Sequence, residues 1–313
     1  FISLILNKVS RMLSNVTVFC FMASYLVALG LELARFLRNK DRFIRPLIFL
    51  FSLAGLVAQT AYLFTRARLT ELPPLLSSSH DWLIVFSWLL VAIFLFINLI
   101  DAELSIGLFL FPLVLALVVS SYFVDTVPNS LVQPAIRSWA LLHASLLVLG
   151  GVGIALSFVT SLMYLIQHRR LKQKQNFTEG FNLPSLAKLA RLNRWALMIS
   201  APLLTVGMGI GIGLGVYVRK GAQSISFFDP VIIVYEIVWV AMIVSVIFIL
   251  RKKQPNQKYI AQLTIWTGGL LLLTVIGIQI LTNIRILNFD SWHSHYSAPL
   301  PEIQRSAAER VIS

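Results

Sequence analysis

The feature that most constrains this chain is an apolar stretch of about 20 residues that recurs along its whole length. A stretch of that length crosses the hydrocarbon core of a bilayer as an α-helix, which satisfies its backbone N–H and C=O groups internally. Hydrophobic residues make up 58% of the chain and charged residues only 12%, which excludes an ordinary soluble domain. The sequence therefore predicts an all-α integral membrane protein, a single polytopic domain over residues 1–313 with a bundle of about eight transmembrane helices. The predicted spans are 13–34, 44–65, 82–100, 105–124, 138–166, 195–218, 231–250 and 260–284.

The net charge of +13 is distributed unevenly between alternate connections. The connections rich in Lys and Arg are near 35–45, 168–194 and 251–258, and the poorer ones are near 66–81, 125–137 and 219–229. Because basic connections are retained in the cytoplasm, the first set is predicted to be cytoplasmic and both termini, with the polar tail 286–313, are predicted to lie outside. The charge thus indicates topology and not nucleic-acid binding. The expected location is a bacterial inner (cytoplasmic) membrane, or an organelle membrane of bacterial origin.

Two connections carry a structural signal of their own. In 183–194 (LPSLAKLARLNR), apolar residues share one helical face and basic residues share the other, which predicts a basic amphipathic helix on the cytoplasmic surface, held by anionic lipid. A docking site for a partner is the alternative. In 66–81, the pair Pro73-Pro74 predicts a helix break and a structured loop or re-entrant cover.

The sequence offers little support for catalysis. Its single cysteine, Cys20, lies in the first predicted span, so the chain can form no internal disulfide and has no CxxC pair. We find no nucleophile–base arrangement, metal motif or phosphate loop, and we expect no enzymatic turnover by this chain alone. The glycine-rich stretch 206–216 (VGMGIGIGLGV) is preceded by no strand, which argues against a dinucleotide site.

The same glycines predict a helix contact. Gly207, Gly211 and Gly215 share one helical face, and Gly209 and Gly213 share another. Small residues let neighbouring helices approach closely in a membrane, so this face is expected to pack against another helix. The alternative is that the bare backbone makes room for a flat ligand.

Three histidines are candidate ligands. His143 lies inside the fifth predicted span, where a histidine is costly unless it has a partner, and His293 and His295 lie in the polar tail. The predicted topology places all three, with the loop 219–230, on the outer face, where two imidazoles could ligate a metal or a haem iron. The alternative is that His143 hydrogen-bonds a neighbouring carbonyl and the tail histidines are solvated.

Two acidic residues lie at the start of the seventh predicted span and inside it. Asp229 followed by Pro230 is a good helix start, because Asp caps and Pro suits the first helical position. Glu236 lies inside the span and is a candidate functional carboxylate, or it bonds to a Tyr or Trp.

Several segments resemble the membrane proteins of cytochrome c-type biogenesis, the CcsA/CcmC-like haem handlers that include the HemX-like proteins. The resemblance covers about residues 80–297. The stretch beginning LLHASLLVLGG (141–151) is similar to the family's helix that carries the outer histidine, with His143 in that position. The stretch 189–211 (LARLNRWALMISAPLLTVGMGIG) resembles the helix before the haem-binding loop, and HSHY places His293 at the second outer histidine.

The resemblance implies haem binding or handling at the outer face, with His143 and His293 as the iron ligands. Phe227, Phe228 and Asp229 would lie in the loop beside the haem. The family's loop reads WGxxWxWDP, whereas this chain reads GAQSISFFDP (221–230), which keeps the Asp-Pro pair but no tryptophan. The family's histidine at the inner end of the seventh span is also absent from FILRKK (248–253).

These departures leave two functions open. The first is a divergent haem-handling protein, and the second is a paralogue without haem that serves as a scaffold or accessory subunit of a larger membrane complex. The expected partners are membrane lipid and either a cytochrome c biogenesis partner or such a complex, and no nucleic acid.

Overall fold

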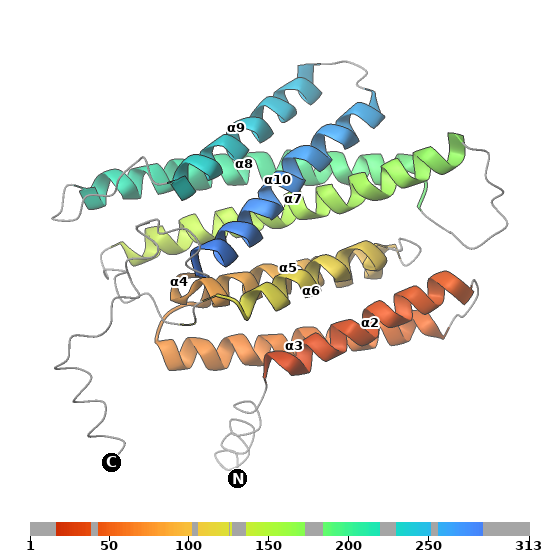
Figure 1. Ribbon diagram of the computed structural model, residues 1–313, viewed down its shortest axis with the longest axis horizontal. Helices are drawn as coiled ribbons and strands as arrows, with labels where there is room; N and C mark the ends of the chain where they lie inside the picture. The colour runs from red at the N-terminus through yellow and green to blue at the C-terminus, as the bar shows by residue number, and fades with distance from the viewer. Residues whose placement is uncertain are drawn as a thin grey trace, which may run out of the picture.

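The computed structural model describes residues 17–38, 43–101, 106–124, 126, 136–172, 184–219, 230–251 and 256–283. These residues form nine helices and no strand (Figure 1). The helices are α2 (Val18–Arg38), α3 (Ile44–Thr70), α4 (Pro74–Ser77), α5 (Ser79–Ile100), α6 (Gly107–Ser121), α7 (Arg137–Lys172), α8 (Leu186–Arg219), α9 (Pro230–Arg251) and α10 (Gln257–Asn283).

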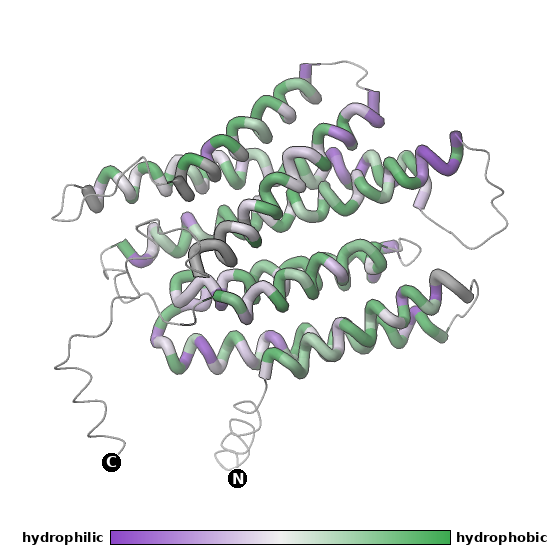
Figure 2. Tube along the Cα trace, viewed as in Figure 1, coloured by the Kyte–Doolittle hydropathy of each residue, from purple (hydrophilic) through white to green (hydrophobic). Residues whose placement is uncertain are grey.

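The helices have the lengths and composition of a membrane bundle. Within the described residues, five stretches are long and apolar enough to cross a bilayer: Val18–Arg35, Ile44–Thr70, Ser79–Ile100, Arg137–Lys172 and Leu186–Tyr217. The apolar helical segments Gly107–Ser121 and Trp239–Phe248 are shorter. Hydrophobic residues run along the lengths of the helices and hydrophilic ones gather toward their ends (Figure 2). The predicted all-α membrane architecture is therefore confirmed, and each of the eight predicted apolar stretches overlaps a described helix.

The helices stack in pairs across the bundle (Figure 1). The pair α2 and α3 packs on α5 and α6, α5 contacts α7, and α7 packs along α8 in the most extensive contact between described helices. The helices α9 and α10 pack on α8 and α7 respectively. We call the end of the bundle where α7 ends and α8 begins the basic end, and the end where α3 ends and α5 begins the opposite end.

The prolines in 66–81 break the helix as predicted. The helix α3 ends at Thr70, and Glu71 follows with a left-handed backbone (φ 54°), a common way to end a helix. The one-turn helix α4 then begins at Pro74, where a missing N–H costs nothing. The Oγ of Ser78 accepts a hydrogen bond from the backbone N–H of Asp81 (3.2 Å) and caps α5.

The prediction of a separate surface helix over 183–194 is wrong. The helix α8 runs without interruption from Leu186 to Arg219, so the segment forms its first turns. Leu189 is fully buried against the other helices, which means that protein covers the apolar face. The predicted exposure of the basic face is confirmed, because Lys188 and Arg191 are exposed.

Glycines bring α7 and α8 into backbone contact. A Cβ atom added at Gly150 would lie 2.5 Å from Cγ of Leu204 and 3.2 Å from its backbone nitrogen, and one added at Gly153 would collide with Oγ of Ser200. Small residues permit such an approach in lipid, where helices associate through close packing and hydrogen bonds. The hydroxyl of Ser157 supplies one of those bonds, since it donates to Oδ1 of Asn193.

A buried polar network joins the other half of the bundle. The hydroxyl of Tyr25 on α2 donates to Oε1 of Gln59 on α3 (2.5 Å), and Nε2 of Gln59 donates to Oγ of Ser87 (2.8 Å) and to the carbonyl oxygen of Ile84 (2.9 Å) on α5. Unpaired polar groups are costly in this environment, so one glutamine fixes the relative positions of three helices.

Candidate functional site

The ring of His143 lies between α7 and α8 and is anchored by one hydrogen bond. Its Nδ1 is 2.7 Å from the carbonyl oxygen of Gly207. Because a carbonyl can only accept, Nδ1 carries the hydrogen and donates, and in the neutral imidazole the lone pair is then on Nε2. Among the described residues, Nε2 has no hydrogen-bond partner. Metal-ligating histidines typically donate their other ring N–H to a carbonyl or carboxylate in this way.

Two of the three glycines on the predicted face pack against α7. A Cβ atom at Gly211 would collide with Cε1 of His143, and one at Gly207 would lie 3.1 Å from Cδ2 of Leu147. The prediction of a helix contact is confirmed for these two. It does not extend to Gly215, where no described atom lies within 4 Å of an added Cβ.

The remaining glycines leave open space. At Gly209 and at Gly213, an added Cβ would meet no described atom within 4 Å. At these two positions, on the face of α8 beside the His143 contact, no described residue covers the backbone. Room for a flat ligand, the alternative interpretation of these glycines, stays a prediction.

The other predicted ligands lie outside the described residues. These are His293 and the loop residues Phe227, Phe228 and Asp229. Pro230 is the first residue of α9, as predicted for an Asp-Pro helix start. Within the described part of the chain, no group of three or more His, Cys, Asp or Glu side chains could hold a metal ion. The pairing of His143 with His293 stays a prediction.

The described half of the site fits haem in its donor chemistry. A haem iron accepts an imidazole nitrogen as an axial ligand. His143 offers Nε2 for such a bond while Nδ1 is held on Gly207. His143 would therefore supply one ligand to the iron, and His293, which lies outside the described residues, stays the predicted second ligand.

A second polar cluster, which the sequence analysis missed, lies at the opposite end. Arg66 donates through Nε and Nη2 to the two carboxylate oxygens of Asp81 (3.0 and 3.1 Å) and also through Nη2 to the carbonyl oxygen of Thr126 (3.0 Å). The Asp81 carboxylate is completely buried. The pair therefore ties α3 to α5 and to the chain after α6.

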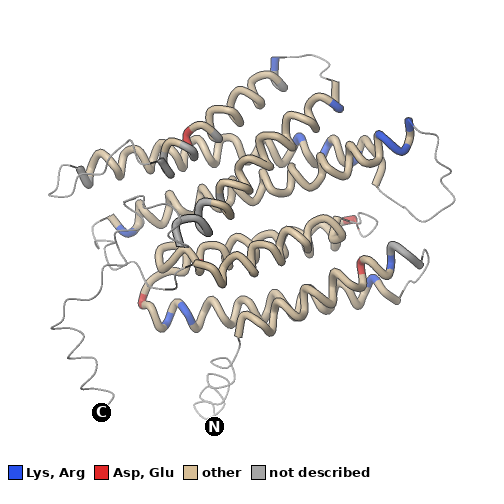
Figure 3. The backbone as a smooth tube through the Cα atoms, in the orientation of Figure 1, with Lys and Arg blue, Asp and Glu red and all other residues tan. Residues whose placement is uncertain are grey.

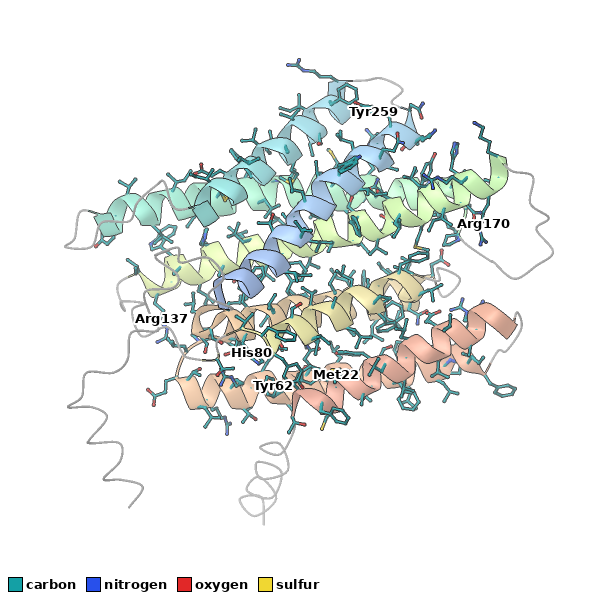
Figure 4. The ribbon with its side chains drawn as sticks, viewed as in Figure 1. Met22, Tyr62, His80, Arg137, Arg170 and Tyr259 are labelled. Carbon is teal, nitrogen blue, oxygen red and sulfur yellow. The ribbon has the colours of Figure 1, made fainter. Side chains whose placement is uncertain are left out.

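His80 completes this cluster beside the ion pair. Its Nδ1 lies 2.8 Å from the carbonyl oxygen of Ser121, and its Nε2 lies 2.9 Å from the hydroxyl of Tyr62. Figure 4 shows Tyr62 and His80 near each other, with Arg137 at the same end of the bundle. Both ring nitrogens are occupied, so this histidine joins helices and has no nitrogen left for a metal. The signal in the sequence was a pair of opposite charges, Arg66 and Asp81, at facing ends of two consecutive apolar stretches.

The comparison with known families covers most of the chain. The model of a family described as Cytochrome C assembly protein matches residues 11–285. The match begins well before residue 80, where the resemblance was expected to begin, and it ends before His293. No curated protein matches the chain.

Substitution of Gly211 tests the contact between α8 and His143. In Gly211→Leu the new side chain must displace the imidazole, so we expect a loss of about 1–3 kcal/mol of stability, as for other overpacked sites. Gly213→Leu, two residues away on the open face, is the matched control and should change stability little. Unfolding of the purified protein in detergent, followed by circular dichroism, measures both. Equal stability of Gly211→Leu and wild type would mean that this face points to lipid.

Substitution of Asp81 tests the cluster at the opposite end. Asp81→Asn leaves the Arg66 guanidinium without its buried counter-charge, so we expect a loss of about 3–5 kcal/mol. Asp101→Asn breaks a more exposed pair with Lys188 (2.6 Å) and should cost at most about 1 kcal/mol. The same unfolding measurement applies, and similar losses in the two variants would show that burial of the Arg66–Asp81 pair contributes nothing.

Proposed function

We propose that this chain, which belongs to the cytochrome c assembly protein family, binds haem at the outer face of the membrane and passes it on during cytochrome c biogenesis. The observation that carries the proposal is the hydrogen bond from Nδ1 of His143 to Gly207, because it directs the lone pair to Nε2. The chain acts as a haem-handling membrane protein and catalyses no turnover by itself.

Each of the predicted site residues would have its own role in haem binding. His143 and His293 would supply nitrogen ligands to the iron, and Phe227 and Phe228 would supply aromatic surface to the porphyrin. Asp229 would start α9 beside the haem. Haem itself supplies an iron that accepts two nitrogen ligands. The carbonyl of Gly207 holds the His143 ring in one orientation, which lowers the entropy lost when Nε2 binds.

Family membership supports the wider setting of the proposal. We place eight transmembrane helices in the bundle, with both termini outside and the basic end in the cytoplasm. Lys and Arg residues gather where α7 ends and α8 begins, which fits the retention of positive charge in the cytoplasm (Figure 3). The membrane is a bacterial inner membrane or an organelle membrane of bacterial origin. The partners are lipid and a cytochrome c biogenesis partner or larger membrane complex.

Two observations favour a second function. The bond to Gly207 satisfies the His143 Nδ1 without any ligand, and the loop 221–230 has no tryptophan on which haem could stack. A family member of this kind would serve as a scaffold or accessory subunit, with His143 retained to join α7 and α8.

Haem reconstitution distinguishes the two functions. With two imidazole ligands the wild type should take up haem and show a low-spin spectrum, and His143→Ala and His293→Ala should each turn it high-spin or abolish binding. His168→Ala is the matched control, because His168 is on the same helix but its ring stacks on Tyr164 near the basic end. A wild type that takes up no haem, or a spectrum unchanged in both variants, would replace haem handling with the accessory function.

Cysteine labelling tests the proposed topology separately. In a Cys20→Ser background, an impermeant thiol reagent added to intact spheroplasts should label His293→Cys and not Arg191→Cys. Both should react after lysis, which controls for access. Arg191 is suitable because its side chain is exposed. Labelling of both cysteines in intact cells, or of Arg191→Cys alone, would refute the assigned sides.

A further inference from the structure

The hydrogen bond between Tyr62 on α3 and His80 on α5 has a defined direction. Nδ1 of His80 lies 2.8 Å from the carbonyl oxygen of Ser121, which can only accept, so Nδ1 carries the hydrogen of the neutral ring. The lone pair is then on Nε2, and the hydroxyl of Tyr62, 2.9 Å away, donates to it. Figure 4 shows the two residues near each other at the opposite end. A phenol therefore directs its proton at a base that can take it.

A second tyrosine of the same half of the bundle has no such base. The hydroxyl of Tyr25 donates to Oε1 of Gln59 (2.5 Å), and an amide oxygen accepts a hydrogen bond without taking the proton. Tyr25 is fully buried and Tyr62 is partly buried, so both phenols lie within the bundle. Of these two tyrosines, only Tyr62 can lose its proton to its partner.

The surroundings of His80 are compatible with a proton on Nε2. The residue is 3% exposed, so an added positive charge is costly if a neighbouring charge opposes it. The Arg66 guanidinium in the same cluster makes two bonds to the Asp81 carboxylate, which neutralises it. The carbonyl of Ser121 accepts from Nδ1 in either protonation state of the ring. The ring of Phe21 covers Tyr62, with 5.7 Å between the centroids.

We propose that Tyr62 and His80 form a redox-active pair. Tyr62 gives one electron to a one-electron oxidant and its hydroxyl proton to Nε2 of His80, so an O–H bond breaks and an N–H bond forms. The products are a neutral tyrosyl radical and an imidazolium. An oxidised phenol is a far stronger acid than a neutral one, so the electron leaves more readily where a positioned base takes the proton. A one-electron reductant reverses both transfers.

The oxidant belongs to the class that peroxide forms with haem iron. In the proposed function, haem binds at the same end of the bundle as Tyr62 and supplies this chemistry. The pair then takes up an oxidising equivalent that would otherwise damage the protein. The redox activity itself rests on the geometry of Tyr62 and His80 and does not require haem, so it is tested with an added oxidant.

Photochemical oxidation of the purified protein in detergent tests the pair. A flash generates ruthenium(III) tris(bipyridine), and electron paramagnetic resonance detects the tyrosyl radical that remains after ascorbate has reduced the exposed radicals. We expect this signal in the wild type and its loss in Tyr62→Phe. In His80→Gln the radical should form about 100-fold more slowly, because an amide replaces a positioned base. Tyr25→Phe is the matched control and should leave the signal unchanged, because Gln59 takes no proton.

Three results would overturn the proposal. These are no radical in the wild type, a signal that persists in Tyr62→Phe, and equal rates in the wild type and His80→Gln, which would mean that the bond only joins α3 to α5. Thermal unfolding confirms that each variant is folded. If His80→Gln does not fold, wild-type protein with isotopically labelled histidine gives the same answer. A radical bonded to His80 shows a hyperfine coupling to the labelled nitrogen, and an unbonded radical shows none.

Discussion

The rest of the structure depends on the close contact between α7 and α8. Helices in lipid gain no hydrophobic free energy from association, so they depend on backbone approach and interhelical hydrogen bonds. The bare Cα atoms of Gly150 on α7 and Gly211 on α8 allow that approach. Only with the two backbones this near can Nδ1 of His143 reach the carbonyl of Gly207. The same contact gives α9 and α10 the surfaces on which they pack.

This arrangement explains how one histidine suits both proposed functions. A histidine inside the bundle needs a partner for Nδ1, and Gly207 provides one whether or not haem is present. Nε2 then has its lone pair available, as a ligand to iron requires. The hydrogen bond to Gly207 offsets the cost of placing His143 in the bundle, so the absence of tryptophan from the loop 221–230 would not by itself remove this histidine. The two functions then differ in what binds Nε2, which is the haem iron in the first and no iron in the second.

Charged residues are buried and paired at the opposite end of the bundle and exposed at the basic end. At the opposite end, Arg66 and Asp81 form a buried pair with two direct bonds, and His80 beside them is fully bonded. Such a cluster joins helices and leaves no side chain free for a ligand. At the basic end, Lys188, Arg191 and Arg194 are exposed on the first turns of α8. The buried pair therefore holds helices together, whereas the basic residues of α8 lie on the surface.

The sequence by itself determined the apolar helices, the break at Pro73-Pro74 and the start of α9 at Pro230, because length, composition and proline geometry act locally. It also pointed to His143 and to the contact face of Gly207 and Gly211. Only the tertiary structure decided that 183–194 continues into α8, that Gly215 is left out of the contact, and that Arg66 meets Asp81. These depend on how far one helix extends along its neighbour and how each is rotated about its axis. Helical periodicity defines which residues share a face, but the partner of that face comes from packing.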